Sequence, residues 1–147
     1  MKNDFSEIIV YTDGGSLNNP GKAAIGVVIH YKNQTKEYSR VIGENKTNNE
    51  AEYEAVIFAL EKVKQLFGKK NLQKVNIVLN LDSELVGNQL KGKYKIMEEK
   101  LIPYFIKFHN LKIDLPNISI NIIPREKNAA ADALVKKSLF PSFLTFI

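Results

Sequence analysis

The stretch Ile8-Ile-Val-Tyr-Thr-Asp-Gly-Gly-Ser16 sets the architecture of this chain. A continuous apolar, β-branched run that stops at Asp-Gly-Gly is typical of a strand that is buried on both faces and ends in a turn. We therefore expect a strand over residues 8–12, with Asp13 at its carboxyl end. A carboxylate in this position lies where open α/β sheets bind their ligands.

Two more apolar runs follow this strand, and turn residues bound them. Asn18-Asn-Pro-Gly21 precedes the run at 24–31, and Lys32-Asn-Gln-Thr35 separates it from the run at 37–42. Short apolar runs punctuated in this way are typical of neighbouring strands. This pattern therefore predicts that the first three strands form an antiparallel meander.

A helix and a fourth strand come next. Thr47 is placed to cap a helix, because apolar residues recur at helical spacing over 51–66. The run at 74–81 predicts a strand that ends at Asp82. A strand, a crossover helix and a strand in one sheet are parallel and right-handed, so this strand can lie beside the first. Asp13 and Asp82 would then emerge at the same edge of the sheet.

The rest of the chain completes an α/β fold. Its pattern predicts a helix at 83–90, a helix at 97–111 that Pro103 kinks, a strand at 118–123, a loop at 124–127 and a helix at 128–140. The whole order predicts a five-stranded mixed sheet, with three antiparallel strands plus parallel strands, flanked by helices. We expect a single domain over 1–147, with its core at about 7–140. The apolar tail at 141–147 is expected to dock on the domain or to pair with a neighbour.

Composition narrows the class of protein. The 147 residues contain no cysteine, which excludes disulfides, thiolate catalysis and cysteine-ligated metals. We find no apolar window of membrane-spanning length and no signal-peptide pattern, so we expect a cytoplasmic protein with no membrane partner. The net charge of +5 suits a polyanionic partner. Only Arg40 and Arg125 are arginines, which favours point-charge contacts to phosphates over base reading.

Two further acids are expected to join the two at the sheet edge. Among the glutamates near 50–54, Glu52 shares its helix stripe mostly with apolar residues, which marks it as the inward one. Asp132 shares a face with Val135 and Leu139, and we expect no arginine or lysine on that face to neutralise it. Oxygen-only donors without histidine or cysteine suit Mg²⁺ or Mn²⁺ rather than zinc.

The motifs that carry these acids resemble a known family. They are Tyr11-Thr-Asp-Gly-Gly-Ser16 with Asn19-Pro-Gly21, Thr47-Asn-Asn-Glu-Ala-Glu52, Leu81-Asp-Ser83 and Pro124-Arg-Glu-Lys-Asn-Ala-Ala-Ala-Asp-Ala-Leu134. In this order they resemble type 1 ribonuclease H, also called ribonuclease HI, over about residues 7–140. The chain has no tryptophan and only a short segment after Val86. It is therefore similar to the compact archaeal or thermophile-like branch that lacks a basic protrusion.

This resemblance implies a ribonuclease H-like fold and an endoribonuclease that hydrolyses the RNA strand of RNA–DNA hybrids. It implies that the four acids bind two Mg²⁺ ions, which activate water and stabilise the departing 3′ oxygen, leaving a 5′-phosphate. Small polar groups would read RNA 2′-hydroxyls in the minor groove. The implied substrate contacts are the Gly14 backbone, Ser16, Asn19, Asn48 and Asn49, with a DNA phosphate near Thr47, and Glu84, Arg125 and Asn128.

Three departures from the family pattern keep alternatives open. Glu84 stands where the family usually has glutamine, and Glu50 where a basic side chain is common. The loop at 124–127 lacks the histidine of many members, and Arg125 is the expected substitute as a phosphate contact. One alternative is a non-catalytic domain of the same fold that binds hybrids or double-stranded RNA, and another is a related nuclease acting on DNA. We expect a monomer, with a tail-mediated dimer as the alternative, and double-stranded RNA as a further candidate substrate.

Overall fold

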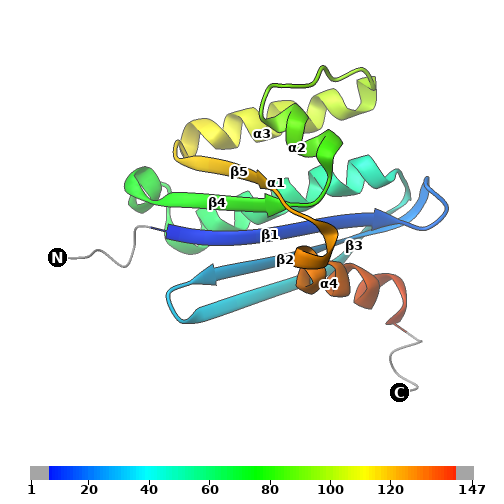
Figure 1. Ribbon diagram of the computed structural model, residues 1–147, viewed down its shortest axis with the longest axis horizontal. Helices are drawn as coiled ribbons and strands as arrows, with labels where there is room; N and C mark the ends of the chain where they lie inside the picture. Colours follow the sequence, from blue (N-terminus) through cyan, green and yellow to red (C-terminus); the bar gives the residue numbers. More distant parts are fainter. Residues whose placement is uncertain (1–6, 142–147) are drawn as a thin grey trace.

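The first strand lies in the middle of the sheet in the computed structural model, which describes residues 7–141 (Figure 1). The strand order is β3-β2-β1-β4-β5. The strands are β1 (Glu7–Ser16), β2 (Gly21–Tyr31), β3 (Gln34–Lys46), β4 (Asn76–Leu81) and β5 (Ile118–Ile122). The first three pair antiparallel, and β4 pairs parallel with both β1 and β5. The predicted five-stranded mixed sheet is thus confirmed, including the parallel placement of β4 beside β1.

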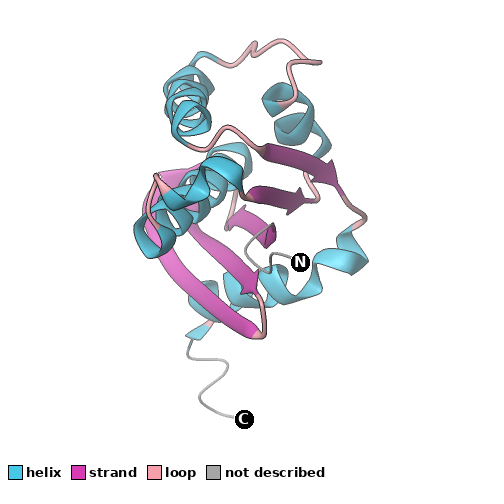
Figure 2. Cartoon of the chain, turned by 90° about the vertical axis from the view of Figure 1, so that its left-hand side faces the viewer, coloured by secondary structure: helices cyan, strands magenta, loops and turns pink. Residues whose placement is uncertain are grey.

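Helices cover both faces of this sheet. They are α1 (Asn48–Phe67), α2 (Glu84–Leu90), α3 (Ile102–Asp114) and α4 (Ala129–Leu139), with 3-10 turns η2 (Asn71–Lys74), η3 (Glu99–Leu101) and η4 (Arg125–Asn128). The two views together place α1 and α4 on opposite faces (Figures 1 and 2). The sheet is therefore sandwiched by helices that come from distant parts of the chain.

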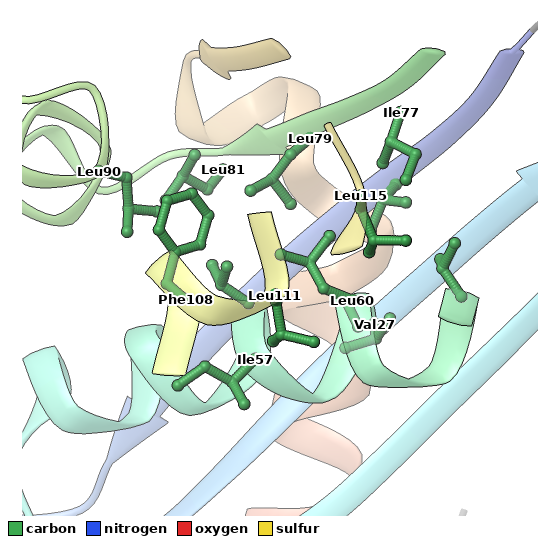
Figure 3. Packing of buried hydrophobic residues seen from close by; sticks show 14 of the residues in the cluster. Val27, Ile57, Leu60, Ile77, Leu79, Leu81, Leu90, Phe108, Leu111 and Leu115 are labelled. Carbon is green, nitrogen blue, oxygen red and sulfur yellow. The ribbon is translucent and has the colours of Figure 1, made fainter. Parts of the chain in front are cut away.

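The main core lies between the sheet and helices α1 and α3 (Figure 3). Leu79 and Leu81 of β4 point into it and meet Leu60 of α1 and Phe108 of α3, and all four are at most 1% exposed. Fully burying side chains of this size contributes roughly 1.5–3 kcal/mol each relative to leaving them exposed. This packing fixes α1 against the sheet and so holds the amino end of α1 near the carboxyl end of β1.

The start of α1 is set by a capping box. The hydroxyl of Thr47 accepts a hydrogen bond from the Glu50 N–H at 3.1 Å, and the Glu50 carboxylate accepts one from the Thr47 N–H at 3.0 Å. This reciprocal pair satisfies two backbone donors that an uncapped helix would leave without partners. The helix ends at Gly68, whose φ of 85° favours glycine. The predicted cap and stop of this helix are both present.

The structure corrects three boundaries. The first strand continues beyond residue 12 to Ser16, because β2 goes on pairing with it as far as Ser16 and Ala23. The helix expected at 97–111 begins at Ile102, so Pro103 falls in its first turn, where no intrahelical hydrogen bond is lost and no kink is required. The expected loop at 124–127 is mostly the turn η4, which runs on to Asn128, so the helix expected at 128–140 begins at Ala129.

Two expectations concern the ends of the chain and the membrane. Residues 142–147, which make up nearly all of the apolar tail, lie outside the described residues, so its expected docking stays a prediction. Within residues 7–141, none of the helices combines the length and the apolar character that a bilayer crossing needs.

Candidate active site

Asp13 lies where β1 outlasts its parallel neighbour. The last pair between β1 and β4 is Tyr11 with Asn80, whereas β1 stays paired with β2 to its end. Beyond that last pair, no strand within residues 7–141 pairs with β1 on the β4 side, so side chains from both faces of the sheet can meet there. The prediction that Asp13 lies at the carboxyl end of its strand is therefore wrong, since β1 runs on to Ser16. Asp13 lies instead just beyond the end of the β1–β4 pairing.

Two glycines allow helices to approach this point closely. A Cβ atom at Gly14 would lie 2.3 Å from the carbonyl oxygen of Ala51 in α1, and one at Gly26 would lie 2.2 Å from that of Ala131 in α4. Any side chain at either position would push the helix away. Gly14 therefore brings the start of α1 onto β1, and Gly26 brings α4 onto β2 from the other face.

Glu52 reaches the site from α1 through this contact. Its side chain is almost buried, at 9% exposed, and its Oε1 atom is buried without a hydrogen-bond partner among the described residues. A buried carboxylate oxygen without a donor is costly unless another group neutralises it. The inward orientation expected for Glu52 from its apolar stripe is what the structure shows.

Asp82 follows β4 and is held by an amide. Asn128 donates from Nδ2 to Asp82 Oδ2 at 2.8 Å and to the carbonyl oxygen of Thr12 at 2.9 Å. The next residue, Ser83, caps α2 by accepting from the Val86 N–H at 3.1 Å. The Asp82 carboxylate is therefore held by the turn into α2 and by Asn128, which also donates a hydrogen bond to β1.

Asp132 enters from α4 and has a basic partner that the sequence reasoning missed. Lys136, one turn further along α4, places its Nζ atom 2.9 Å from Asp132 Oδ2. The expectation that no lysine shares this face is wrong, since residues four apart on a helix lie side by side. The four-residue spacing between Asp132 and Lys136 is the sequence signal that predicts this pair.

Three of the four acids form a tight group. Each of Asp13, Glu52 and Asp82 offers a carboxylate oxygen, and these oxygens all lie within 4.8 Å of one another. Asp132 is not in this group among the described residues, but it is close enough to act on Asp13. The structure thus brings together the four predicted acids, three in a cluster and one beside it.

Crowding and burial make these carboxyl groups hard to ionise. Burial, followed by the charges of Asp82 and Asp132, raises the pKa of Asp13 from 3.8 to about 7, against a hydrogen bond from the Gly14 backbone that lowers it. Burial, followed by the charges of Asp13 and Asp82, raises the pKa of Glu52 well above its usual range, against a hydrogen bond from the Gly14 backbone and the charge of Arg125, which lower it. Negative charges gathered at such a cost are typical of functional sites.

The donor set fits a hard divalent cation. It consists of carboxylate oxygens from β1, from α1 and from the residue after β4, with no histidine or cysteine in the cluster. Glu52 contributes one carboxylate oxygen to the cluster, and its Oε1 atom is buried without a hydrogen-bond partner among the described residues. A cation there would offset the repulsion that raises the pKa of Asp13. The residues therefore fit a site for such an ion.

A cavity of about 350 Å³ opens beside the acids. Its lining includes Asp13, Glu52, Asp132 and Lys136, together with Ser16 and Arg125. The cavity therefore adjoins both the acids and part of the polar set predicted to contact substrate.

Three of the residues predicted to contact RNA link the end of β1 and the turn after it to the start of α1. We call this set of contacts, made by Ser16, Asn19 and Asn48, the latch. Asn48 accepts from the Ser16 N–H through Oδ1 at 2.8 Å, and its own N–H donates to Asn19 Oδ1 at 2.8 Å. The Ser16 hydroxyl donates to the Lys46 carbonyl oxygen at 2.7 Å. The side-chain N–H groups of Asn48 and Asn19 are not used in these contacts. Asn49 lies next to this latch in the first turn of α1, half-buried.

Other predicted contacts are placed differently. Asn128 is only 1% exposed and donates its amide to Asp82 and Thr12, so it positions a carboxylate, and its predicted contact with substrate stays a prediction. The Glu50 carboxylate is engaged in the capping box and accepts from the Tyr104 hydroxyl at 3.3 Å. Glu84 is the exposed first residue of α2. The Glu50 carboxylate is therefore already hydrogen-bonded within the protein.

Tyr104 completes a network that the sequence did not indicate. Its hydroxyl shares one proton between two acceptors, of which Glu54, at 3.0 Å, is the nearer. Glu54 also pairs with Lys46 at 2.6 Å. These contacts tie α3 to the start of α1. No single-residue pattern predicts them, because they depend on how α3 packs against α1.

The sheet order and the carboxylate group together define a ribonuclease H-like domain. A family model described as reverse transcriptase-like matches residues 11–138. LC11-RNase H1, isolated from compost by a metagenomic approach and solved in complex with an RNA/DNA hybrid, is 46% identical, with a TM-score of 0.85 over 92% of this chain and 99% of that one.

Two further relatives extend the comparison. RNase H1 from the halophilic archaeon Halobacterium salinarum is 34% identical, with a TM-score of 0.77 over 90% of this chain and 97% of that one. The bifunctional protein Rv2228c of Mycobacterium tuberculosis is 29% identical over 90% of this chain, which spans 35% of that protein's length. This chain belongs to the reverse transcriptase-like family and, within it, to the ribonuclease H1 proteins.

Proposed function

We propose that this protein is a metal-dependent endoribonuclease that hydrolyses the RNA strand of RNA–DNA hybrids. The observation that carries the proposal is the meeting of Asp13, Glu52 and Asp82 within 4.8 Å at the edge of the sheet. It is supported by the similarity over nearly the whole chain to LC11-RNase H1, whose structure includes an RNA/DNA hybrid.

The acids are proposed to hold two Mg²⁺ ions, with Mn²⁺ as a substitute. Such a pair, when bound, activates a water for in-line attack on the phosphodiester and stabilises the departing 3′ oxygen, which leaves a 5′-phosphate. The protein's part is to fix the ligands. Asn128 orients Asp82, Gly14 brings Glu52 to Asp13, and Gly26 lets α4 deliver Asp132. Arg125, on the cavity wall, is the group that can hold the scissile phosphate.

RNA is proposed to be recognised through its 2′-hydroxyls in the minor groove. The Ser16 hydroxyl donates its proton within the protein, so it is left to accept a hydrogen bond from a 2′-hydroxyl. The side-chain amide of Asn48 is free to donate from Nδ2, since its contact with Ser16 uses Oδ1. A DNA strand offers no hydroxyl at these positions, so contacts of this kind distinguish RNA from DNA.

We favour an active enzyme over a non-catalytic domain of the same fold. That alternative rested on negative charge from Glu50 and Glu84 near the RNA. The Glu50 carboxylate accepts hydrogen bonds from the Thr47 N–H and the Tyr104 hydroxyl within the protein, whereas Glu84 is exposed. We propose that the protein acts as a monomer in the cytoplasm. We also propose double-stranded RNA as a further substrate, because A-form RNA presents the same minor-groove hydroxyls.

Cleavage of an end-labelled RNA–DNA hybrid tests the proposal. Duplex RNA and duplex DNA serve as competing substrates, each with Mg²⁺, Mn²⁺ or EDTA. The wild type should cut the RNA strand only with a metal, and Asp82→Asn should lose at least about 1,000-fold in rate. The matched control is Asp114→Asn, the same chemical change at an acid paired with Lys64 and Lys69 away from the site. It should cut at the wild-type rate.

Each other outcome has a meaning. Binding of the hybrid without cutting under every metal would establish the non-catalytic alternative. Cutting of duplex DNA would establish the DNA-acting one. An unchanged rate for Asp82→Asn would remove the acidic cluster from the mechanism.

A further inference from the structure

Lys136 and Asp132 form an ion pair on the rim of the acidic cluster. The Nζ and Oδ2 atoms lie 2.9 Å apart, and both residues line the cavity that also contains Asp13 and Glu52. The lysine side chain is 66% exposed and that of the aspartate is 35% exposed. The pair is therefore partly open to solvent, and the charge of Asp132 acts on Asp13.

Asp132 differs from the three clustered acids in having an ammonium partner. Asp13, Glu52 and Asp82 already present oxygens within 4.8 Å of one another, whereas one oxygen of Asp132 is engaged by an ammonium. A carboxylate oxygen that accepts from an ammonium has less charge to offer to a second cation. A divalent cation that uses Asp132 must therefore displace Lys136 or share the carboxylate with it.

We propose that Lys136 competes with the divalent cation for Asp132 and so lowers the affinity of the cation position that Asp132 completes. This inference rests on the proposed function only in assigning Asp132 to a cation. The ammonium partly offsets the charge of the fourth acid, which reduces the repulsion among the four carboxylates. Release costs little, because the lysine is mostly exposed and its charge is readily hydrated once it leaves.

The size of the effect follows from the exposure of the pair. Ion pairs at the surface change an equilibrium by about two- to five-fold. Removing the lysine should therefore tighten the weaker cation step by about that factor and leave the stronger step unchanged. General loss of positive charge would act on both steps, and at 0.15 M salt the screening length of about 8 Å limits that contribution.

Binding of Mn²⁺ without nucleic acid tests the inference. The electron paramagnetic resonance signal of free Mn²⁺ gives the stepwise Kd values at 0.15 M KCl for the wild type and for Lys136→Met. The matched control is Lys137→Met, the same charge change at the next, exposed lysine, for which the described part of the chain shows no ion pair. We expect a two- to five-fold lower Kd for the weaker step in Lys136→Met and less than a two-fold change in Lys137→Met.

A second background separates competition from a general charge effect. In Asp132→Asn the lysine has no carboxylate to hold, so adding Lys136→Met should leave every Kd unchanged. Lys136→Arg keeps the ion pair and should bind Mn²⁺ as the wild type does. An equal effect of Lys136→Met in both backgrounds, or equal effects of the Lys136 and Lys137 changes, would overturn the inference.

The same titration distinguishes this inference from the proposed function. If the wild type binds no Mn²⁺, the cation site of the proposed function is wrong. If the wild type binds Mn²⁺ and Lys136→Met binds it with the same Kd values, the cation site stands and the role of Lys136 is wrong. Circular dichroism of each variant checks that the helices remain folded.

Discussion

Asp13 and Gly26 face each other as cross-strand partners in the β1–β2 ladder. Directly opposed residues in an antiparallel pair project to the same face of the sheet. The side chain missing at Gly26 is what makes room for the Ala131 carbonyl of α4 on that face. The acid and the glycine thus work as a unit, because α4 carries Asp132 to Asp13 only where no side chain separates the helix from the strand.

Gly26→Ala tests this unit. The added Cβ would lie 2.2 Å from the Ala131 oxygen, so α4 must shift outward. We expect a loss of about 1–3 kcal/mol in the free energy of unfolding, measured by urea denaturation, and at least a ten-fold drop in cleavage of the hybrid. Gly15→Ala is the control, since its Cβ would meet Val135 at an ordinary 3.4 Å. Wild-type stability in Gly26→Ala would show that α4 approaches less closely than described.

The raised pKa of Asp13 predicts how stability depends on pH when EDTA removes metals. The folded protein keeps a proton on Asp13 up to about pH 7, whereas the unfolded chain loses it near pH 4. The folded state binds more protons in this window, so the free energy of unfolding falls as pH rises from 4 to 7. Asp13→Asn abolishes this contribution and should be more stable than the wild type at pH 8 by roughly 2–4 kcal/mol.

Asp114 provides a control of opposite sign for that pH series. Lys64 and Lys69 hold its pKa below the usual range, so its contribution is present above pH 4 and is lost as pH falls through the folded pKa. Asp114→Asn should therefore lose stability at neutral pH instead of gaining it. Parallel pH profiles for the wild type and Asp13→Asn would contradict the assigned pKa. Added Mg²⁺ should narrow the gap between these two proteins at pH 8, because it binds the charged cluster.

Asn128→Ala tests whether this residue positions Asp82. It removes two donated hydrogen bonds, one to Asp82 and one to the Thr12 carbonyl, at a site that is 1% exposed. We expect the free energy of unfolding to fall by about 1–3 kcal/mol and kcat to fall more than the affinity for the hybrid. Asn121→Ala is the comparison, since Asn121 donates to Asn80 at 3.3 Å away from the acids. A change confined to hybrid affinity would return Asn128 to the substrate contacts.

Asn48→Ala and Asn49→Ala should have separable effects. Asn48 latches Ser16 to α1 through its Oδ1 atom, so its loss should lower both the melting temperature and the preference for RNA. Asn49 takes no part in that latch, and its replacement should lower the preference for RNA over DNA with little change in stability. Binding constants for hybrid, duplex RNA and duplex DNA in Ca²⁺ give the preference, and thermal melts give the stability. If Asn49→Ala left the preference unchanged, Asn49 would not read the RNA strand.

Much of the site could be predicted because local rules place it. The right-handed crossover puts the ends of β1 and β4 at one edge, which brings Asp13 to Asp82, and the apolar stripe of α1 turns Glu52 inward. The role of Asn128 could not be predicted, since its two acceptors are 46 and 116 residues away in sequence. The role of Gly26 likewise depends on the approach of α4. The pairing of Lys136 with Asp132, by contrast, follows from their four-residue spacing on one helix.

The anchoring of α4 has a consequence for the way this protein can fail. Val135 and Leu139 pack with Ala24 in a small cluster separate from the main core. Regions with few buried apolar contacts open locally at lower free energy than the core does. Amide protons in α4 should therefore exchange earlier than those in α1. Transient opening of this helix would withdraw the fourth carboxylate while the other three stay in place, so heat or a weakly destabilising mutation would abolish activity before the sheet unfolds.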